Sequence, residues 1–513
     1  MDSKEQGEPK PVPGEAPITR DELARSAGVA SLARAASIIE ILSQPLATWL
    51  FGLATYGVYV VLWGAINLVS NIADLGMTIA LSRVVPSATS EESAHGGVKF
   101  ALLVAVLPTR LLALVATLNA DALAGLVSSA PEDRASLPAA IAIFAWALPL
   151  WTFIEVATAA ARARRAFGPE IRLRLFWEQV ARIIFALGFF LVGFRSTGLV
   201  LAHLCSLTVT AALCVRLLGR YFDLSLLVRA PLSPRIAANL LLSGLALLPS
   251  ALSRRLLIDA PPLLLNMMLP GARGATAAAL FEIARKISTV PNLIQQAVQY
   301  VIGPMSAAQS RIDHNAVALL YHFACRLSAA LILPLAGLLI FAGADILKIY
   351  RPEAAAALPL LQALVVGRGL VAIAGPATVV VEMTGHRGLP LLNSLIGTVL
   401  GGNLAFLLVP GLGPLGMAIA AGAAAVLSAY AAAFELRIGA GFTTFDRTLV
   451  AGIAVALAGS ALMGLAELLD NSAARLAVVI PLWGATTWCA LRIGMSHSDR
   501  LALGAFARRT RLV

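Results

Sequence analysis

The sequence has few charged residues for its length. Of 513 residues, 13% are charged and 59% are hydrophobic, and the mean hydropathy is +0.83. Soluble domains carry about 25% charged residues, so this composition excludes a chain made of one or two soluble domains. Long uncharged runs are present instead, such as Tyr56 to Leu81, and a helix needs only about 20 apolar residues to cross a bilayer. The composition predicts an all-α integral membrane protein.

Cysteine and histidine are also sparse. The four cysteines lie in predicted spans without any Cys-x-x-Cys spacing, and the six histidines are scattered. We therefore expect no metal site and no cofactor. The phosphate-binding pattern Gly-x-x-x-x-Gly-Lys-Ser/Thr does not occur either. Any transport would then depend on an ion gradient, on the membrane potential, or on consumption of the substrate on the far side.

Apolar runs of sufficient length predict about fourteen membrane helices. They are placed at 30–51, 56–82, 97–119, 138–160, 175–194, 197–217, 238–269, 276–302, 317–341, 355–382, 388–409, 413–436, 447–468 and 474–493. Residues 1–29 are polar and rich in proline, so we expect a disordered cytoplasmic tail there.

The first twelve helices fall into two sets of six. We expect an N-lobe at 30–217, a cytoplasmic linker at 218–237 and a C-lobe at 238–436, with the lobes forming pseudo-repeated bundles around a central cavity. Two further helices are appended at 437–493, and residues 494–513 form a basic cytoplasmic tail.

Basic residues are concentrated on one side of the predicted topology. The loops and tail assigned to the cytoplasm contain Arg162, Arg164, Arg165, Arg172, Arg174, Arg216, Arg220, Arg229, Arg235, Arg500, Arg508, Arg509 and Arg511. The opposite loops contain only Arg134, Arg195, Arg273, Lys348, Arg351 and Arg475. This asymmetry places both termini in the cytoplasm. Contact with anionic membrane lipids accounts for the net charge of +11, so we expect no nucleic-acid partner.

A helical hairpin recurs loosely in the two halves. Phe51 to Pro86 and Gly271 to Pro304 each begin with a glycine-rich step and continue as an apolar helix. The residues that carry the pattern in the first copy are Gly57, Tyr59, Asp74, Leu75, Gly76 and Arg83. This pattern resembles the second helix of oligosaccharide flippases. They form the O-antigen and exopolysaccharide branch of the superfamily that includes lipid II flippases and multidrug and toxic compound extrusion transporters.

The resemblance implies a function and a location. It implies a flippase that moves a lipid-linked oligosaccharide, carried on polyprenyl diphosphate, across the bacterial inner membrane by alternating access. The product would serve surface polysaccharide synthesis, with a polymerase or ligase of the same glycan pathway as a partner. No catalytic residues are expected.

Charged side chains inside the spans are candidates for the substrate site, because they are costly in a membrane unless they face water or a partner. The candidates for binding the pyrophosphate are Arg34, Arg254, Arg255, Arg285 and Arg368. An arginine fork donates two parallel hydrogen bonds to a phosphate, and the resemblance implies this role for Arg34, Arg254 and Arg255 by their location. Arg182 and Arg326 lie near the predicted cytoplasmic face, where their side chains could reach the interface.

Three acidic residues are candidates for coupling to an ion. They are Glu40, Asp74 and Asp259. Asp259 follows Arg255 by four residues, so the two could instead form a salt bridge within their helix. Asp74 could alternatively pair with Arg83 or cap the packing of its helix.

Two other functions remain open at this point. An ion-coupled exporter of small cationic drugs would share the architecture, but its cavity would be expected to be lined by acids rather than bases. A membrane glycosyltransferase or polymerase would need a large external loop with catalytic carboxylates. The longest external loop, Ala120 to Leu137, holds only Asp121, Glu132 and Asp133.

Overall fold

A computed structural model describes residue 39 and residues 43–88, 90–164, 166, 168–309, 313–383 and 388–512. All regular structure within these residues is helical. Eleven of the described helices are long and apolar enough to cross a membrane, and a twelfth is added if the bent pair Pro234–Pro249 and Ala251–Met268 is one span. The predicted all-α membrane fold is confirmed, whereas the number fourteen stays a prediction. The first predicted helix, 30–51, lies mostly outside the described residues.

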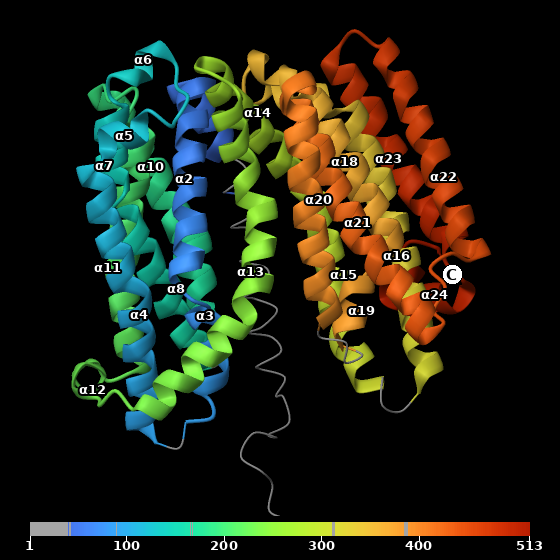
Figure 1. The fold of residues 1–513 in the computed structure, drawn as a ribbon. Helices are drawn as coiled ribbons and strands as arrows, with labels where there is room; N and C mark the ends of the chain where they lie inside the picture. Colours follow the sequence, from blue (N-terminus) through green and yellow to red (C-terminus); the bar gives the residue numbers. More distant parts are fainter. Residues whose placement is uncertain are drawn as a thin grey trace, which may run out of the picture.

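Helices of the first half form one bundle, which lies at the left of Figure 1. They are α2 (Leu53–Ala73), α3 (Met77–Val84), α4 (Glu91–Leu118), α5 (Ala120–Ala124), α6 (Pro131–Arg134), α7 (Leu137–Phe144), α8 (Ala147–Ala163), α9 (Gly168–Glu170), the π-helix η1 (Ile171–Trp177), α10 (Glu178–Val192), α11 (Gly198–Tyr221) and α12 (Leu224–Arg229). A helical segment at residues 43–51 precedes them.

The second half forms another bundle, at the right of Figure 1, with α22 and α23 at its outer edge and α13 and α14 between the bundles. Its helices are α13 (Pro234–Met268), α14 (Ala272–Ile287), α15 (Thr289–Gln309), α16 (His314–Phe341), α17 (Gly343–Lys348), the 3-10 helix η2 (Pro352–Ala357), α18 (Leu358–Ala374), α19 (Ala377–Met383), α20 (Gly388–Leu412), α21 (Pro414–Ala440), α22 (Arg447–Gly464), the 3-10 helix η3 (Leu465–Leu468), α23 (Ser472–Gly494), α24 (His497–Ala502) and α25 (Ala505–Arg509).

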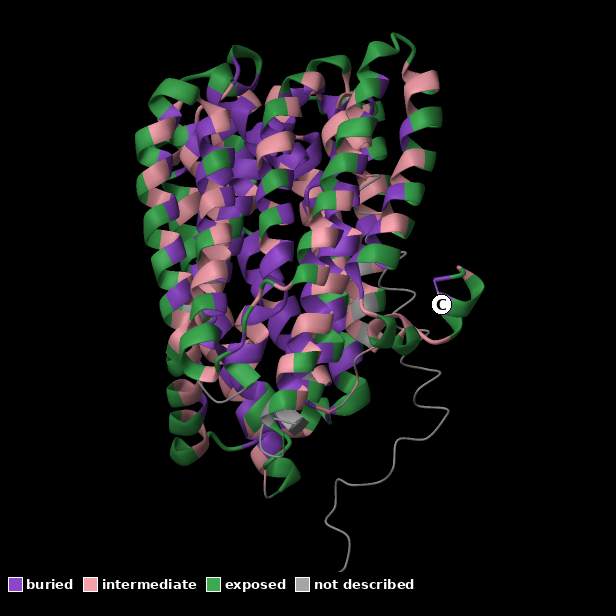
Figure 2. Ribbon diagram, turned by 90° about the vertical axis from the view of Figure 1, so that its right-hand side faces the viewer, coloured by how far each residue is buried: buried purple, intermediate pink, exposed green. Residues whose placement is uncertain are grey.

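Apolar side chains cover much of the outer surface. Leu191, Leu407 and Leu468 are 82%, 74% and 83% exposed. Figure 2 places exposed residues on the outward faces of the helices and buried residues between them. Apolar surface of this extent is unfavourable in water and is matched by lipid acyl chains. The outer surface is therefore that of a multi-pass membrane protein.

The run predicted as one helix at 56–82 is two helices, so that prediction is wrong in this respect. The chain turns between α2 and α3, where Leu75 and Gly76 have φ of 50° and 75°. Left-handed backbone ends a helix, and glycine adopts it without the strain that a Cβ introduces. Gly76 also packs against α13, since a Cβ there would lie 2.4 Å from the carbonyl oxygen of Gly244.

Replacing Gly76 by alanine should therefore destabilise the protein by about 1–3 kcal/mol, through backbone strain and displacement of α13. Thermal unfolding in detergent would measure the loss. Gly484→Ala is the matched control, because Gly484 is a helical glycine with no neighbour within 4 Å of a built Cβ. Equal melting temperatures for Gly76→Ala and wild type would contradict the packing described here.

The run predicted at 276–302 is likewise divided, at Ser288. Pro291 lacks the N–H that would bond to the carbonyl of Ile287. The hydroxyl of Ser288 donates to the Arg285 carbonyl at 2.7 Å, and that of Thr289 donates to the Lys286 carbonyl at 2.5 Å. These side chains bond to carbonyls that a continuous helix would use, so α14 ends and α15 begins here.

Helix α13 is bent by 41° between Pro249 and Ala251. Pro249 has no N–H to continue the helical hydrogen bonds, which is a common cause of such kinks. The bend directs the first part of α13 beneath the first bundle, while its second part runs up between the bundles (Figure 1). One helix thereby contacts both halves of the protein.

The bundles meet most closely where α2 packs on α13 and α14. A Cβ at Gly57 would lie 1.8 Å from the carbonyl oxygen of Ala275, and one at Gly64 would lie 2.6 Å from Cδ1 of Leu263. Small residues allow helix backbones to approach in this way. Gly57 is therefore required for the contact between the bundles.

Candidate functional site

A cavity of about 340 Å³ lies where the two bundles meet. Residues 43–47, α2, η1, α10 and α11 contribute its walls on one side, together with Trp151 of α8, and α13 and α14 contribute them on the other. The charged residues of the described walls are Arg174, Glu178, Arg182, Arg255, Asp259, Glu282, Arg285 and Lys286. Five of these are basic and three are acidic. The predicted central cavity is thus present, and its described walls have an excess of positive charge.

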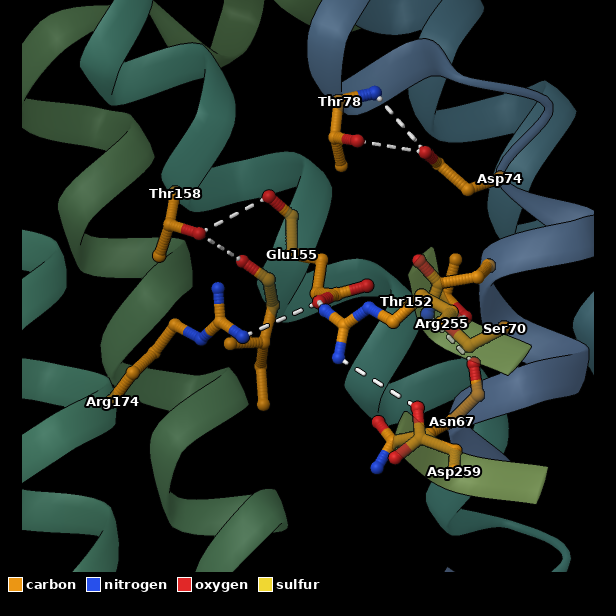
Figure 3. Close-up of polar contacts among 12 residues, drawn as sticks. Asn67, Ser70, Asp74, Thr78, Thr152, Glu155, Thr158, Arg174, Arg255 and Asp259 are labelled. Atoms are coloured by element: carbon orange, nitrogen blue, oxygen red, sulfur yellow. Dashed lines mark hydrogen bonds and ion pairs between the residues drawn. The ribbon is translucent and has the colours of Figure 1, made fainter. Parts of the chain in front are cut away.

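A chain of alternating charges crosses from the first bundle to α13 (Figure 3). Glu155, on α8, is 8% exposed, and its Oε1 lies 3.3 Å from Nη2 of Arg174 and 3.8 Å from Nη2 of Arg255. Nη1 of Arg255 lies 3.8 Å from Oδ2 of Asp259, one turn further along α13. Each buried carboxylate is thereby neutralised by an arginine, and Arg255 connects two of them. The Arg255–Asp259 pair expected from the sequence spacing is confirmed.

Helix α14 contributes a second ion pair. Glu282 accepts two hydrogen bonds from Arg285, at 2.8 Å from Nε and 2.6 Å from Nη2. The guanidinium is only 18% exposed and it borders the cavity. This geometry holds the arginine fork in a fixed orientation at the wall, where an anion could compete with Glu282 for its donors.

Arg182 and Tyr59 form a third polar group on the opposite wall. Nη1 of Arg182 donates to the Tyr59 hydroxyl at 3.2 Å, and Nη2 donates to Oε1 of Gln179. All three residues line the cavity. Arg182 therefore points into the protein, and the expectation that it reaches the membrane interface is wrong.

The predicted site residues are only partly brought together. Arg255, Arg285 and Asp259 line the cavity. Arg368 lies half-buried on α18 and is not among the described wall residues. The backbone at Arg254 belongs to α13, but its side chain lies outside the described structure. Arg34 and Glu40 also lie outside the described residues, so their predicted roles stay predictions.

Asp74 is not among the described wall residues of the cavity, and it has a local structural role. Its Oδ2 accepts a hydrogen bond of 2.8 Å from the Thr78 hydroxyl, and both of its carboxylate oxygens lie 3.3 Å from the Thr78 nitrogen (Figure 3). The carboxylate thereby caps the first turn of α3, which follows the break at Gly76. Its proposed part in ion coupling has no support from these contacts.

Sequence reasoning missed several wall residues. The sequence pattern places Arg174 in a cytoplasmic loop and Arg182 near the interface, and it indicates no role for Glu178. The three residues are spaced by four, which places them on one side of the helical segment formed by η1 and α10. That spacing was the available signal. It was obscured because basic residues near a helix end also fit the positive-inside rule.

Arg326 is held by two acids from the end of the chain. It donates to Asp446, which caps α22, and to Asp499 on α24. Burial would raise the pKa of Asp446, but hydrogen bonds from Arg326 and the Leu449 N–H keep it below its usual value. Arg326 therefore connects α22 and the C-terminal segment to α16, and it is not among the described wall residues of the cavity.

The described residues contain no group of three or more His, Cys, Asp or Glu side chains that could hold a metal ion. The cysteines are all free thiols. Nothing in the described cavity therefore points to a metal ligand set.

Searches with models of protein families and against curated protein sequences give no match. Solved structures do match. The lipid II flippase MurJ in an inward closed conformation is 12% identical, with a TM-score of 0.71 over 90% of this chain and 97% of its own. An inward-facing multidrug resistance MATE transporter of the MOP superfamily is 18% identical, with a TM-score of 0.64 over 79% and 98%.

A third match is a MOP superfamily transporter from Pyrococcus furiosus Vc1, described by the reverse polarity of its binding pocket. It is 14% identical, with a TM-score of 0.57 over 82% of this chain and 95% of its own. At these identities the likeness establishes the fold alone, which this chain shares with the lipid II flippase and the two transporters. The narrower resemblance to oligosaccharide flippases stays a prediction.

Proposed function

We propose that the protein is a flippase for a lipid-linked oligosaccharide carried on polyprenyl diphosphate. The observation that carries this proposal is the excess of basic over acidic side chains in the described walls of the cavity between the bundles. A diphosphate brings several negative charges, and arginine forks bind such groups through paired, charge-assisted hydrogen bonds. Arg182, Arg255 and Arg285 are the proposed ligands.

The likeness to a lipid II flippase, which extends over 90% of this chain, supports a lipid-linked substrate. In the proposed cycle the two bundles rock about the cavity, so that it opens to each side of the membrane in turn. Gly57 of α2 and Ala275 of α14 must move apart for the cavity to open beside these two helices. The proposed location is the bacterial inner membrane with both termini in the cytoplasm, where a polymerase or ligase would use the flipped product.

An ion-coupled exporter of small molecules is the second candidate. The likeness to a MATE multidrug transporter favours it, and Asp259 and Glu282 offer carboxylates to a cation. Both acids are already paired with arginines, Arg255 and Arg285. A cationic drug would therefore have to displace a positive charge from each, which makes this candidate the weaker one.

Reconstituted protein distinguishes the candidates. Proteoliposomes would contain a fluorescent polyprenyl-diphosphate disaccharide, and a membrane-impermeant quencher would report the fraction of label in the outer leaflet. We expect the protein to make label in the inner leaflet accessible, whereas liposomes without protein should protect it. Transport of a cationic dye with no movement of the labelled lipid would contradict the flippase proposal and favour the exporter. Release or transfer of sugar would indicate an enzyme.

A further inference from the structure

His203, on α11, is a buried histidine directly behind the cavity wall. It is 0% exposed, and its ring lies 4.2 Å from the Trp63 ring and 5.7 Å from the rings of Tyr59 and Phe144. Nδ1 lies 3.0 Å from the Tyr59 hydroxyl. Nε2 has no hydrogen-bond partner in the described part of the chain. A buried ring nitrogen without a partner is unfavourable and calls for an explanation.

The carboxylate of Glu178 lies beside this nitrogen. Its Oε1 is 3.9 Å from Nε2 of His203, and the two side chains are 4% and 0% exposed. If Nε2 carries a hydrogen, it lies beside an anion without bonding to it. If Nε2 carries none, two acceptors face each other. In the second case one added proton supplies the missing donor, and in the first case a proton added at Nδ1 makes the ring cationic, so that it attracts the carboxylate. Small movements would then close the hydrogen bond.

The charged surroundings of the pair connect it to the substrate cavity. Arg182 follows Glu178 by four residues on α10 and bonds to the same Tyr59 hydroxyl that contacts His203. Arg174, one turn before Glu178, is engaged by Glu155 of α8 and by Glu170. The thiol of Cys214, on α11, is a further titratable group near Glu178 and Arg174. Glu178 and Arg182 both line the cavity, so the pair shares a wall with a proposed anion ligand.

We infer that Glu178 and His203 form a proton-binding site in the cavity wall, and that a proton bound there strengthens the binding of an anionic substrate at Arg182. Without the proton, the Glu178 carboxylate and the substrate compete for the charge of Arg182. With the proton, whichever of the two residues holds it, the wall gains one positive charge. By linkage, binding of the anion then promotes uptake of a proton. The identity of the anion as a diphosphate lipid rests on the function proposed above.

Calorimetry of the purified full-length protein in detergent tests this coupling. The probe is geranylgeranyl diphosphate, titrated in two buffers of different ionisation enthalpy across a range of pH. We expect uptake of up to one proton per ligand bound, and affinity that weakens by about tenfold per pH unit above the range in which the pair titrates. Glu178→Gln and His203→Gln should each abolish the uptake. Glu435→Gln is the control, because Glu435 accepts from Asn393 in the second bundle, outside the described cavity walls.

Three outcomes are distinguishable. Proton uptake that depends on Glu178 and His203 supports the inference. Ligand binding by wild type without proton uptake at any pH overturns it and leaves the proposed function intact. Absence of binding at every pH contradicts the proposed function, and the proton site is then decided by NMR of histidines labelled with ¹³C. A His203 resonance that does not move between about pH 5 and pH 9 overturns the inference, whereas titration that shifts in Glu178→Gln supports it.

Discussion

Replacing Arg255 by alanine is expected to lower lipid flipping by about 100-fold or more while the protein still inserts at normal abundance. Arg255 lies 3.8 Å from both Glu155 and Asp259, which are 8% and 9% exposed. The Arg255 side chain is 35% exposed, so its removal leaves the two carboxylates less fully compensated at a cost below the ~3–5 kcal/mol typical of a fully buried pair. It also removes one fork proposed to bind the diphosphate. The quencher assay in proteoliposomes measures the effect.

Further variants separate charge neutralisation from ligand binding. Arg255→Lys should recover only part of the activity, since an ammonium group cannot make paired hydrogen bonds to phosphate. If the double variant Arg255→Ala with Asp259→Ala flips lipid normally, Arg255 serves only to neutralise Asp259. Arg110→Ala is the control, because Arg110 lies in the span of α4 with an exposed side chain. Wild-type flipping by Arg255→Ala itself would refute the assignment.

A Gly57→Val protein is expected to lose nearly all turnover for a different reason. The Cβ of any larger residue would lie 1.8 Å from the carbonyl oxygen of Ala275, which belongs to backbone and cannot rotate away. The substitution should therefore force α2 and α14 apart and hold the bundles open at that end. A transporter that cannot close one side cannot alternate.

Spin labels report this directly. Labels at Ala54 on α2 and Arg273 on α14, in a background without the native cysteines, should be further apart in Gly57→Val than in the labelled wild type. Gly188→Val provides the control, since nothing lies within 4 Å of a Cβ built at Gly188. An unchanged distance distribution, or normal flipping by Gly57→Val, would mean that the contact is not an obligatory part of the cycle.

Hydropathy was sufficient to predict a membrane fold built of helices, because a bilayer requires long apolar segments and these can be recognised in the sequence. It could not predict where those segments break. The apolar run continues through Leu75 and Gly76, and the turn there follows from the left-handed backbone and from the contact of Gly76 with Gly244. Such a contact joins residues far apart in the chain, so it cannot be predicted from the local sequence pattern.

The same distinction applies to the cavity. The pair of Arg255 and Asp259 was predictable, since residues four apart share a helix face. The partnership of Arg174 with Glu155 was not, because the two lie on different elements that meet only after folding. The sequence also indicates no role for His203, since its neighbours Tyr59, Trp63 and Glu178 come from α2 and α10. Charged residues within the predicted spans indicate that a site exists. Which of them belong to that site depends on how the helices pack.

In the proposed flippase, the pairing of Arg255 and Arg285 with carboxylates would also limit which anions can leak through the membrane. Arg255 is held between Glu155 and Asp259, and Arg285 is held by Glu282. A chloride ion entering the empty cavity would have to displace a carboxylate that is covalently fixed beside its arginine, and it brings only one charge and no paired geometry. A diphosphate brings several charges and can engage more than one fork at once. In the proposed flippase, these carboxylates would act as tethered counter-ions at Arg255 and Arg285, which a multivalent anion displaces more readily than a small one.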